Sequence, residues 1–464
     1  MSPTHALALV IIPVVTVGSV AFSLLFRPIR DLFFAAMAFG CILTEHFDVH
    51  FDSEAWYRGS TRGVEISLVA ILALAVLMGC TIGRGASRPR WFWPASLGLL
   101  LIYTAYATLS VCVFSPRQFG AFELIKMYET VIVFLASAAY LRTRREWTIL
   151  LAALSCAVAI EGAWAIEQKV FKHVDRTPGS LDHENSLSMY LCLVCPLLVA
   201  GAFRAWNARL GLLCGAAVLF GTVGLILTFS RTGLPVFAVT ALGATLACTS
   251  FRPTPRRLAL AATVGVIVVG VVAVSWSHIV ERYDSSSLEE EYADQQEEGR
   301  GVYLRYAMEI VHDRPLGVGL NNWSYYVSRI YGPRSGFNYA DYDYLRRIYG
   351  TNLEKASVFD DAYLPAPAHN LCALTLGELG FPGLVLFLGL WMRWGLMGLP
   401  FVFRARKSAG ALMGAGILFG LAGIFGQSQT EWVYRQTPIL FTFYILMGGL
   451  AAIVHARRTH PEEV

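Results

Sequence analysis

The sequence predicts an all-α protein that crosses a membrane many times, as a bundle of about 12–13 helical spans with one large, partly helical external loop. Hydrophobic residues make up 55% of the chain, charged residues only 15%, and the mean hydropathy is +0.52. A soluble domain of this length rarely has such a composition. Apolar segments of membrane-spanning length recur along the chain, and basic residues cluster in alternate short connections between them.

Thirteen apolar segments are candidate spans. The second is short enough to lie at the membrane interface or to re-enter the membrane. The first is too long for a signal peptide and lacks a basic start and a small-residue cleavage site, so we expect it to be a membrane anchor. The segments are 6–26, 32–45, 66–83, 94–114, 119–141, 147–168, 186–203, 210–229, 232–250, 258–276, 370–402, 409–426 and 437–455.

Basic clusters in alternate loops predict the orientation of these spans. They hold 18 of the 37 lysines and arginines, with few acids beside them. By the positive-inside rule these loops and the C-terminus are cytoplasmic, and thirteen spans then place the N-terminus outside. The net charge of +4 therefore indicates topology and no contact with nucleic acid. The clusters are Arg27/Arg30, Arg84/Arg88/Arg90, Arg142/Arg144/Arg145, Arg204/Arg209, Arg252/Arg256/Arg257, Arg404/Arg406/Lys407 and Arg457/Arg458.

The spans divide the chain into four regions. Transmembrane helices occupy 1–168 and, with the Ser-Arg-Thr-Gly turn, 169–276; an external loop follows at 277–368, and the last transmembrane helices at 369–464. A loop as long as the third region is expected to fold as a small cap. Within it, "GVYLRYAMEIVHDRPLGVGLNN" predicts an amphipathic helix that Pro315 and the following glycines end.

Five basic side chains fall on the face that the positive-inside rule normally depletes of arginine. Taken singly, each has a plain structural interpretation: a charged turn, a solvated helix, a histidine at a helix start. Together they predict an anion site with a base beside it, because the planar guanidinium suits phosphate and imidazole titrates near neutral pH. They are Arg231 in "LILTFSRTGLPVFAV", Arg300 and Arg305 at the loop helix, Arg176 in "VDRTPGSLDHEN", and His369 at the start of the next span.

Three motifs in order give the chain a family resemblance over about residues 170–450. "TFSRTG" at 228–233, "GR…AMEIVHDRPLGVGLNN" at 299–322 and "HNLCALTLGELGFPG" at 369–383 resemble the O-antigen ligase/polymerase family of bacterial membrane glycosyltransferases. That family's functional turn, loop arginine and His-Asn pair correspond to Arg231, Arg300 and His369-Asn370. There are two departures: Arg314 stands where the family usually has His, and Tyr303 or Leu304 where it has Trp. They leave the choice between Arg300 and Arg305 open.

The resemblance implies a GT-C-like membrane glycosyltransferase in the bacterial inner membrane, with its active site facing the periplasm. The donor would be a polyprenyl-diphosphate-linked glycan, and an acceptor hydroxyl would displace the diphosphate with inversion. His369 would be the general base, Arg231 with Arg300 or Arg305 would bind diphosphate, and Arg176 and Asn370 would support them. We expect no metal or other cofactor. Partners would be the glycan donor, a lipid or glycan acceptor and membrane lipids, with no nucleic acid.

The acceptor stays open at this point. It could be lipid A-core in a ligase, another lipid-linked repeat in a polymerase, or a protein side chain. From a different class, a lipid-linked glycan transporter would also carry charges within its spans, and a membrane scaffold is a third alternative. The in-span charges Glu123, Lys126 and Glu129 recur at three-residue spacing, which is typical of an ion-paired helix face, and no internal repeat is visible.

Overall fold

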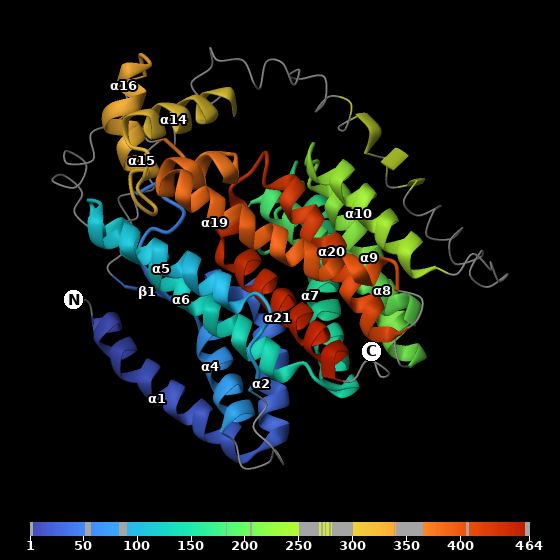
Figure 1. Cartoon of the computed structure of the whole chain (residues 1–464). Helices are drawn as coiled ribbons and strands as arrows, with labels where there is room; N and C mark the ends of the chain where they lie inside the picture. Colours follow the sequence, from blue (N-terminus) through green and yellow to red (C-terminus); the bar gives the residue numbers. More distant parts are fainter. Residues whose placement is uncertain are drawn as a thin grey trace.

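The computed structural model is a bundle of packed helices with one short sheet (Figure 1). It describes the chain except residues 1–2, 52–56, 83–90, 182, 205–206, 250–268, 271, 274, 278–279, 281–299, 338, 340–364, 405–407 and 460–464, and except the side chains of 3–7, 45, 204 and 300. The sheet pairs β1 (Val49–Phe51) antiparallel with β2 (Val64–Ile66), Val49 opposite Ile66. Apart from this sheet, the regular elements of the described residues are helices, so the predicted all-α membrane fold is confirmed.

Within the described part of the chain, seven helices are long and apolar enough to cross a membrane. Three apolar helices are shorter, and α6 (Arg117–Tyr140) carries the in-span charges. The predicted segment 32–45 begins on α2 (Arg27–Gly40) and continues through a 3-10 helix (Cys41–Leu43) into α3 (Thr44–Phe47), whereas 258–276 lies almost wholly outside the described residues. The seven are α1 (Pro3–Leu25), α7 (Arg144–Val170), α8 (Glu184–Arg204), α9 (Ala208–Leu227), α19 (Leu371–Val402), α20 (Ala409–Gln427) and α21 (Thr437–Thr459); the shorter three are α4 (Leu68–Thr81), α5 (Leu97–Val113) and α10 (Gly233–Cys248).

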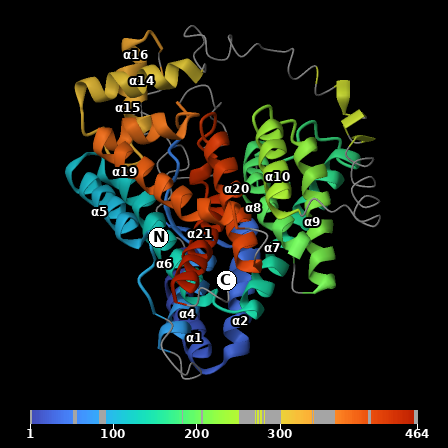
Figure 2. The same ribbon diagram turned by 45° about the vertical axis from the view of Figure 1, so that its right-hand side comes forward.

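The described basic residues near the starts of α2 and α7 and near the end of α21 lie at one end of the bundle, which we call the basic end. The clusters Arg84/Arg88/Arg90 and Arg252/Arg256/Arg257, with Arg406 and Lys407, lie outside the described residues. Arg145 Nη2 lies 2.7 Å from Asp31 Oδ2, and Arg30 donates to the Gly79 carbonyl. The C-terminal helix reaches the same end, where the rings of His455 and Phe92 are tilted by 32° with centroids 4.1 Å apart. Because successive helices reverse direction, the turn after α9 and the start of α19 lie at the opposite end, which we call the site end (Figure 2).

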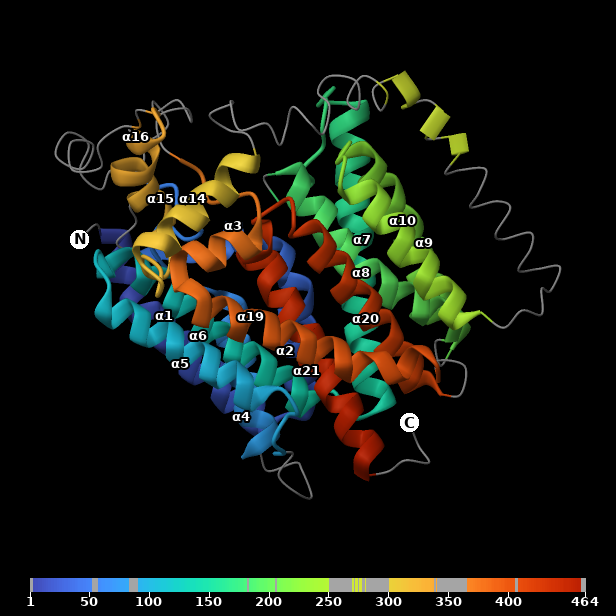
Figure 3. The ribbon, with the colours of Figure 1, turned by 45° about the horizontal axis from the view of Figure 1, so that its top comes forward.

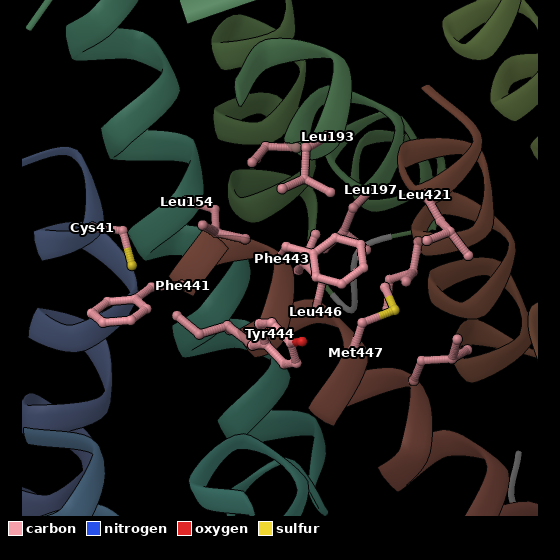
Figure 4. Packing of buried hydrophobic residues seen from close by; sticks show 14 of the residues in the cluster. Cys41, Leu154, Leu193, Leu197, Leu421, Phe441, Phe443, Tyr444, Leu446 and Met447 are labelled. Atoms are coloured by element: carbon pink, nitrogen blue, oxygen red, sulfur yellow. The ribbon is translucent and has the colours of Figure 1, made fainter. Parts of the chain in front are cut away.

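The apolar core surrounds α21, which packs against α6 and α20. Phe441, Phe443 and Met447 are fully buried among side chains of neighbouring helices, including Leu197 of α8 and Leu421 of α20 (Figure 4). The Cys192/Cys195 pair is buried in the same core, as expected for small apolar side chains.

Two of the in-span charges, Glu123 and Lys126, are ion-paired, as their spacing predicted, whereas Glu129 accepts a hydrogen bond from the Ser67 amide at 3.3 Å. Lys126 Nζ lies 3.2 Å from Glu123 and donates to the Arg435 carbonyl at 2.8 Å. Arg435 pairs with Glu378 at 2.6 Å. Glu123, Lys126, Glu378 and Arg435 thus form two buried ion pairs, which offset the cost of removing these charges from water.

Three helices lie above the start of α19 at the site end (Figure 3). They are α14 (Arg300–Asp313), α15 (Trp323–Tyr326) and α16 (Gly332–Arg334), and a short π-helix at Val327–Tyr331 joins the last two. As predicted, α14 ends just before Pro315. Tyr306, Ile310 and Trp323 pack against Leu374 in a second apolar cluster. This cluster fixes α14 over the residues that follow His369.

A kink in α19 locks the motif after α14 to the helix below it. Gly380 has φ +66°, which frees the carbonyls of the preceding turn. The Val318 and Gly319 amides donate to the Gly377 and Glu378 carbonyls at 3.0 and 2.8 Å, and the Phe381 amide donates to the Pro315 carbonyl at 3.2 Å. Backbone hydrogen bonds thus join the "PLGVG" segment after α14 to the "GELGF" segment of α19. We call this pair of segments the backbone joint.

Asn321 joins the same motif to the hairpin and to α6. Its Nδ2 donates to the Thr61 and Phe119 carbonyls, both at 2.9 Å, and its Oδ1 accepts from the Ser60 amide at 2.8 Å. A buried amide with all these partners satisfied holds three chain segments in one register.

Candidate active site at the start of α19

Two adjacent residues start α19 in different ways. Asn370 is its N-cap, accepting from the Ala373 amide at 2.9 Å. His369 lies one residue earlier, and its Nδ1 is 3.0 Å from Glu431 Oε2. Asn370 is therefore the capping residue of α19. His369 does not cap the helix, and its imidazole contacts a carboxylate.

Glu431 belongs to the loop 428–436 between α20 and α21, which we call the Glu431 loop. Its side chain is 4% exposed, and its Oε1 accepts from Asn185 Nδ2 at 2.8 Å. A carboxylate fixed in this way orients the ring: with Nδ1 donating to Glu431, Nε2 is the nitrogen that can accept a proton. This tautomer is inferred from the hydrogen-bond partner.

Tyr303 of α14 covers the imidazole. The two rings are stacked at 29°, with centroids 5.6 Å apart, and Tyr303 is buried. Leu304 is 56% exposed, so Tyr303 is the residue that stands beside His369, where the resemblance leads one to expect a tryptophan.

The two loop arginines occupy different faces of α14. Position 300 precedes Tyr303 by three residues, which places both on one face of the helix, whereas position 305 follows by two and lies on another. Arg305 Nε is 3.9 Å from Glu309 Oε1, and its guanidinium lies 5.8 Å from the Tyr306 ring.

Arg231 sits in a tight turn between α9 and α10. Phe229 has φ +48°, and Ser230 Oγ accepts from the Gly233 amide at 3.2 Å. Gly233 is required by close packing, because a Cβ there would overlap Ser188 Oγ of α8. The Arg231 side chain is half-buried at this turn.

The Glu431 loop and the end of α20 join Arg231's turn to the start of α19. Thr430 Oγ1 donates to Thr232 Oγ1 at 3.1 Å. Asn370 Nδ2 donates to the Gln429 carbonyl at 2.8 Å, and the Leu371 amide donates to the Ser428 carbonyl at 2.9 Å. Segments far apart in sequence, around Arg231 and His369, are therefore attached to the same few residues.

Arg176 lies against the back of the Arg231 turn. Its Nε donates to the Thr228 carbonyl at 3.3 Å, and it forms an ion pair with Glu184 at the first turn of α8. Its charge is therefore largely compensated, and its contacts hold the turn in place.

Residues 216–388 match the family model described as O-antigen ligase. This match supports an assignment to the O-antigen ligase/polymerase family. The matched segment contains Arg231, Arg300 and His369, together with both halves of the backbone joint. The match supports a role in glycosyl transfer at a membrane. No curated protein matches the chain.

Sequence reasoning missed two residues of this candidate site, Glu431 and Asn185, and both lie outside the matched segment. The available signal was an acid in a short site-end loop between two apolar helices, in "QSQTEWVYRQT". No group of three or more metal-binding side chains is found among the residues that the structure describes.

Proposed function

We propose that the chain transfers a glycan from a polyprenyl-diphosphate donor to an acceptor hydroxyl, with inversion at the anomeric carbon. The observation that carries the proposal is the buried Glu431 beside His369, at the loop that also contacts the Arg231 turn. A base oriented by a carboxylate and placed next to an arginine turn suits a reaction that removes a proton and releases a diphosphate.

In the proposed step the acceptor oxygen attacks the anomeric carbon while the bond from that carbon to the diphosphate oxygen breaks. The hydroxyl proton moves to Nε2 of His369, and Glu431 stabilises the imidazolium that forms. The electron pair of the broken bond stays on the diphosphate. Arg231, together with an arginine of α14, binds that charge through charge-assisted hydrogen bonds.

Of the two α14 arginines, Arg300 is the proposed diphosphate ligand. Its position shares a helix face with Tyr303, which stacks on His369. Arg305 has Glu309 3.9 Å away and lies on another face. Arg176 and Asn370 are proposed as positioning residues, because their contacts hold the Arg231 turn and the start of α19.

The proposed location is the bacterial inner membrane, with the site end in the periplasm and the C-terminus in the cytoplasm. The basic end supports this orientation, since arginines that begin or end successive helices gather there.

The proposed domain organisation keeps 277–368 as a cap, supported by the packing of α14 and α15 on α19.

The direct test uses purified protein, a polyprenyl-diphosphate-linked glycan and a lipid acceptor in detergent. His369→Ala is expected to lower kcat by about 10²–10⁴ while thermal stability and donor binding are retained. His312→Asn, an exposed histidine of α14, is the matched control. His369→Asn is also expected to be inactive, because the cap is Asn370. A rate close to wild type in His369→Asn would rule out the base assignment.

Two further measurements separate the alternatives. Transfer is expected to persist in EDTA, as it should when arginines stabilise the leaving group. Vesicle flux of lipid-linked glycan without a covalent product would instead indicate a transporter. Comparing lipid A-core, a second lipid-linked repeat and a protein as acceptors distinguishes a ligase, which we favour, from a polymerase and a protein O-glycosylation enzyme.

A further inference from the structure

A cavity of about 370 Å³ opens between the β1–β2 hairpin, α6 and the Glu431 loop. We call it the hairpin cavity. Its volume falls within the usual range of ligand pockets. Its walls include Ser60, Arg62 and Glu65 from the hairpin, Lys126 from α6, and Trp432 and Gln436 from the Glu431 loop. None of these residues has a role in the proposed step.

Charges of both signs line the hairpin cavity. Lys126 is fully buried and lies 3.2 Å from Glu123, and the remaining charged lining residues are one acid, Glu65, and one arginine, Arg62. Burial, followed by the charge of Glu65, raises the pKa of Asp48, which lies near this wall. A wall with donors and acceptors but little net charge suits a neutral, hydroxyl-rich ligand better than a diphosphate.

Trp432 gives the same wall a flat aromatic surface. It is half-buried beside hydroxyl, amide and charged groups. A sugar ring presents C–H groups on its faces and hydroxyls around its edge. An aromatic face with polar groups around it is complementary to that arrangement.

Contacts along residues 427–437 place this cavity relative to the base. Thr430 contacts the Arg231 turn, Glu431 contacts His369, and Trp432 and Gln436 line the cavity. The order along the chain is therefore arginine turn, base, cavity. An in-line displacement needs the incoming hydroxyl on the side of the anomeric carbon opposite to the leaving diphosphate, and a base close to that hydroxyl.

We propose that the hairpin cavity binds the sugar ring that carries the acceptor hydroxyl. This inference rests on the proposed function, since it assigns the second substrate of the same reaction. It explains why the hairpin is fixed so firmly: Asn321 bonds to both Ser60 and Thr61 at the cavity wall. A fixed wall keeps the acceptor ring in one orientation toward His369.

Cysteine protection tests the binding without any turnover. Ser60→Cys is made in a chain in which the exposed Cys112 and Cys156 are replaced by alanine, and maleimide modification is followed with three probes. The probes are the oligosaccharide freed by mild acid from the acceptor lipid, the glycan freed from the polyprenyl carrier, and inorganic pyrophosphate. Only the acceptor oligosaccharide is expected to slow modification, by about tenfold or more at saturation. Ser335→Cys, a half-exposed serine at the end of α16, is the matched control and is expected to react at one rate throughout.

The other outcomes overturn the proposal in different ways. Protection by the carrier glycan alone would assign the cavity to the donor. Protection by pyrophosphate would make it an anion site. No protection by any probe would show that the cavity does not bind a sugar. Repeating the assay with His369→Ala separates this inference from the proposed function, because acceptor protection should persist although transfer is lost. In kinetics, Arg62→Ala is expected to raise the acceptor KM several-fold with kcat and donor KM nearly unchanged; a fall in kcat alone would contradict a binding role.

Discussion

At the residue scale, the start of α19 separates a structural role from the proposed chemical one. Asn370 satisfies the first turn of the helix, and this leaves the His369 ring to contact Glu431. The neighbouring ring of Tyr303 restricts the imidazole from the other element, α14. A histidine fixed from two sides needs little reorganisation to accept a proton.

Glu431→Gln tests the orienting role. Glutamine keeps the size of the side chain but removes the charge that would stabilise an imidazolium, so kcat is expected to fall by about 10²-fold or more while acceptor and donor KM change little. Steady-state kinetics on the purified protein measure this. Glu309→Gln, on the exposed side of α14, serves as the control. Loss of fold in Glu431→Gln, with kcat retained in the folded fraction, would mean that the carboxylate is only structural.

Arg231 makes a second residue-scale prediction. Arg231→Ala is expected to lower transfer by about 10²–10³-fold, about 2.7–4 kcal/mol in the transition state. Arg231→Lys should restore only part of the rate, because the two-pronged hydrogen bonding of guanidinium is lost. The same assay with Arg305→Ala should show a much smaller loss. Equal losses in Arg231→Ala and Arg305→Ala, or a wild-type rate in Arg231→Ala, would contradict the proposed diphosphate site.

At this scale the sequence pointed to site residues whose type is unusual for their surroundings. It did not point to site residues whose type is ordinary for theirs. Arg231 interrupts an apolar run and His369 begins one, so both attract attention. Glu431 lies in a polar loop where an acid is ordinary, and only tertiary packing makes it buried and brings Asn185 to it. Its partnership with His369 spans 62 residues, which no local pattern encodes.

At the element scale, the kink in α19 decides how α14 is placed. The sequence predicted one long span at 370–402, and the structure has one helix, Leu371–Val402, with a break at Gly380. The "GELGFPG" segment contained the signal, since glycine and proline close together disturb a helix. What occupies the freed carbonyls, the amides of Val318 and Gly319, could not be read from either segment alone.

Gly380→Ala tests this joint. Its backbone conformation is one that residues with a Cβ rarely adopt, and a Cβ would overlap the Pro315 carbonyl. We expect the free energy of unfolding to fall by about 1–3 kcal/mol, which would be seen as a lower Tm in detergent. Gly395→Ala, in the same helix with open space around it, should be neutral or slightly stabilising. Equal Tm values for the two variants would show that the joint does not restrain the helix.

At the scale of the whole molecule, the two ends of the bundle differ in charge and in content. The alternation of basic loops was visible in the sequence because each cluster is local. The clusters that the structure describes meet at one end because the chain reverses, which was predictable; the ion pairs formed there, such as Arg145 with Asp31, were not. The site end depends on contacts between helices of all four regions, which sequence patterning does not specify.

Reporter fusions test the orientation of this bundle. Fusions after Arg145 and at the C-terminus are expected to read cytoplasmic, whereas an insertion at Gly336, which is exposed with open space around it, should read periplasmic. Alkaline phosphatase and green fluorescent protein give opposite readouts and control for expression. A cytoplasmic signal from Gly336 would reverse the proposed face of the reaction.

The partnership of His369 with Glu431 bears on how such enzymes can be recombined. The family match ends at residue 388, yet the carboxylate lies 43 positions farther along the chain, beyond another complete helix. A chimera that exchanges only the matched segment would inherit a histidine from one parent and its orienting loop from the other. A breakpoint placed after Thr437 would take His369 and the Glu431 loop from the same parent. We therefore expect active hybrids within the family mainly when this loop and the matched segment come from one parent.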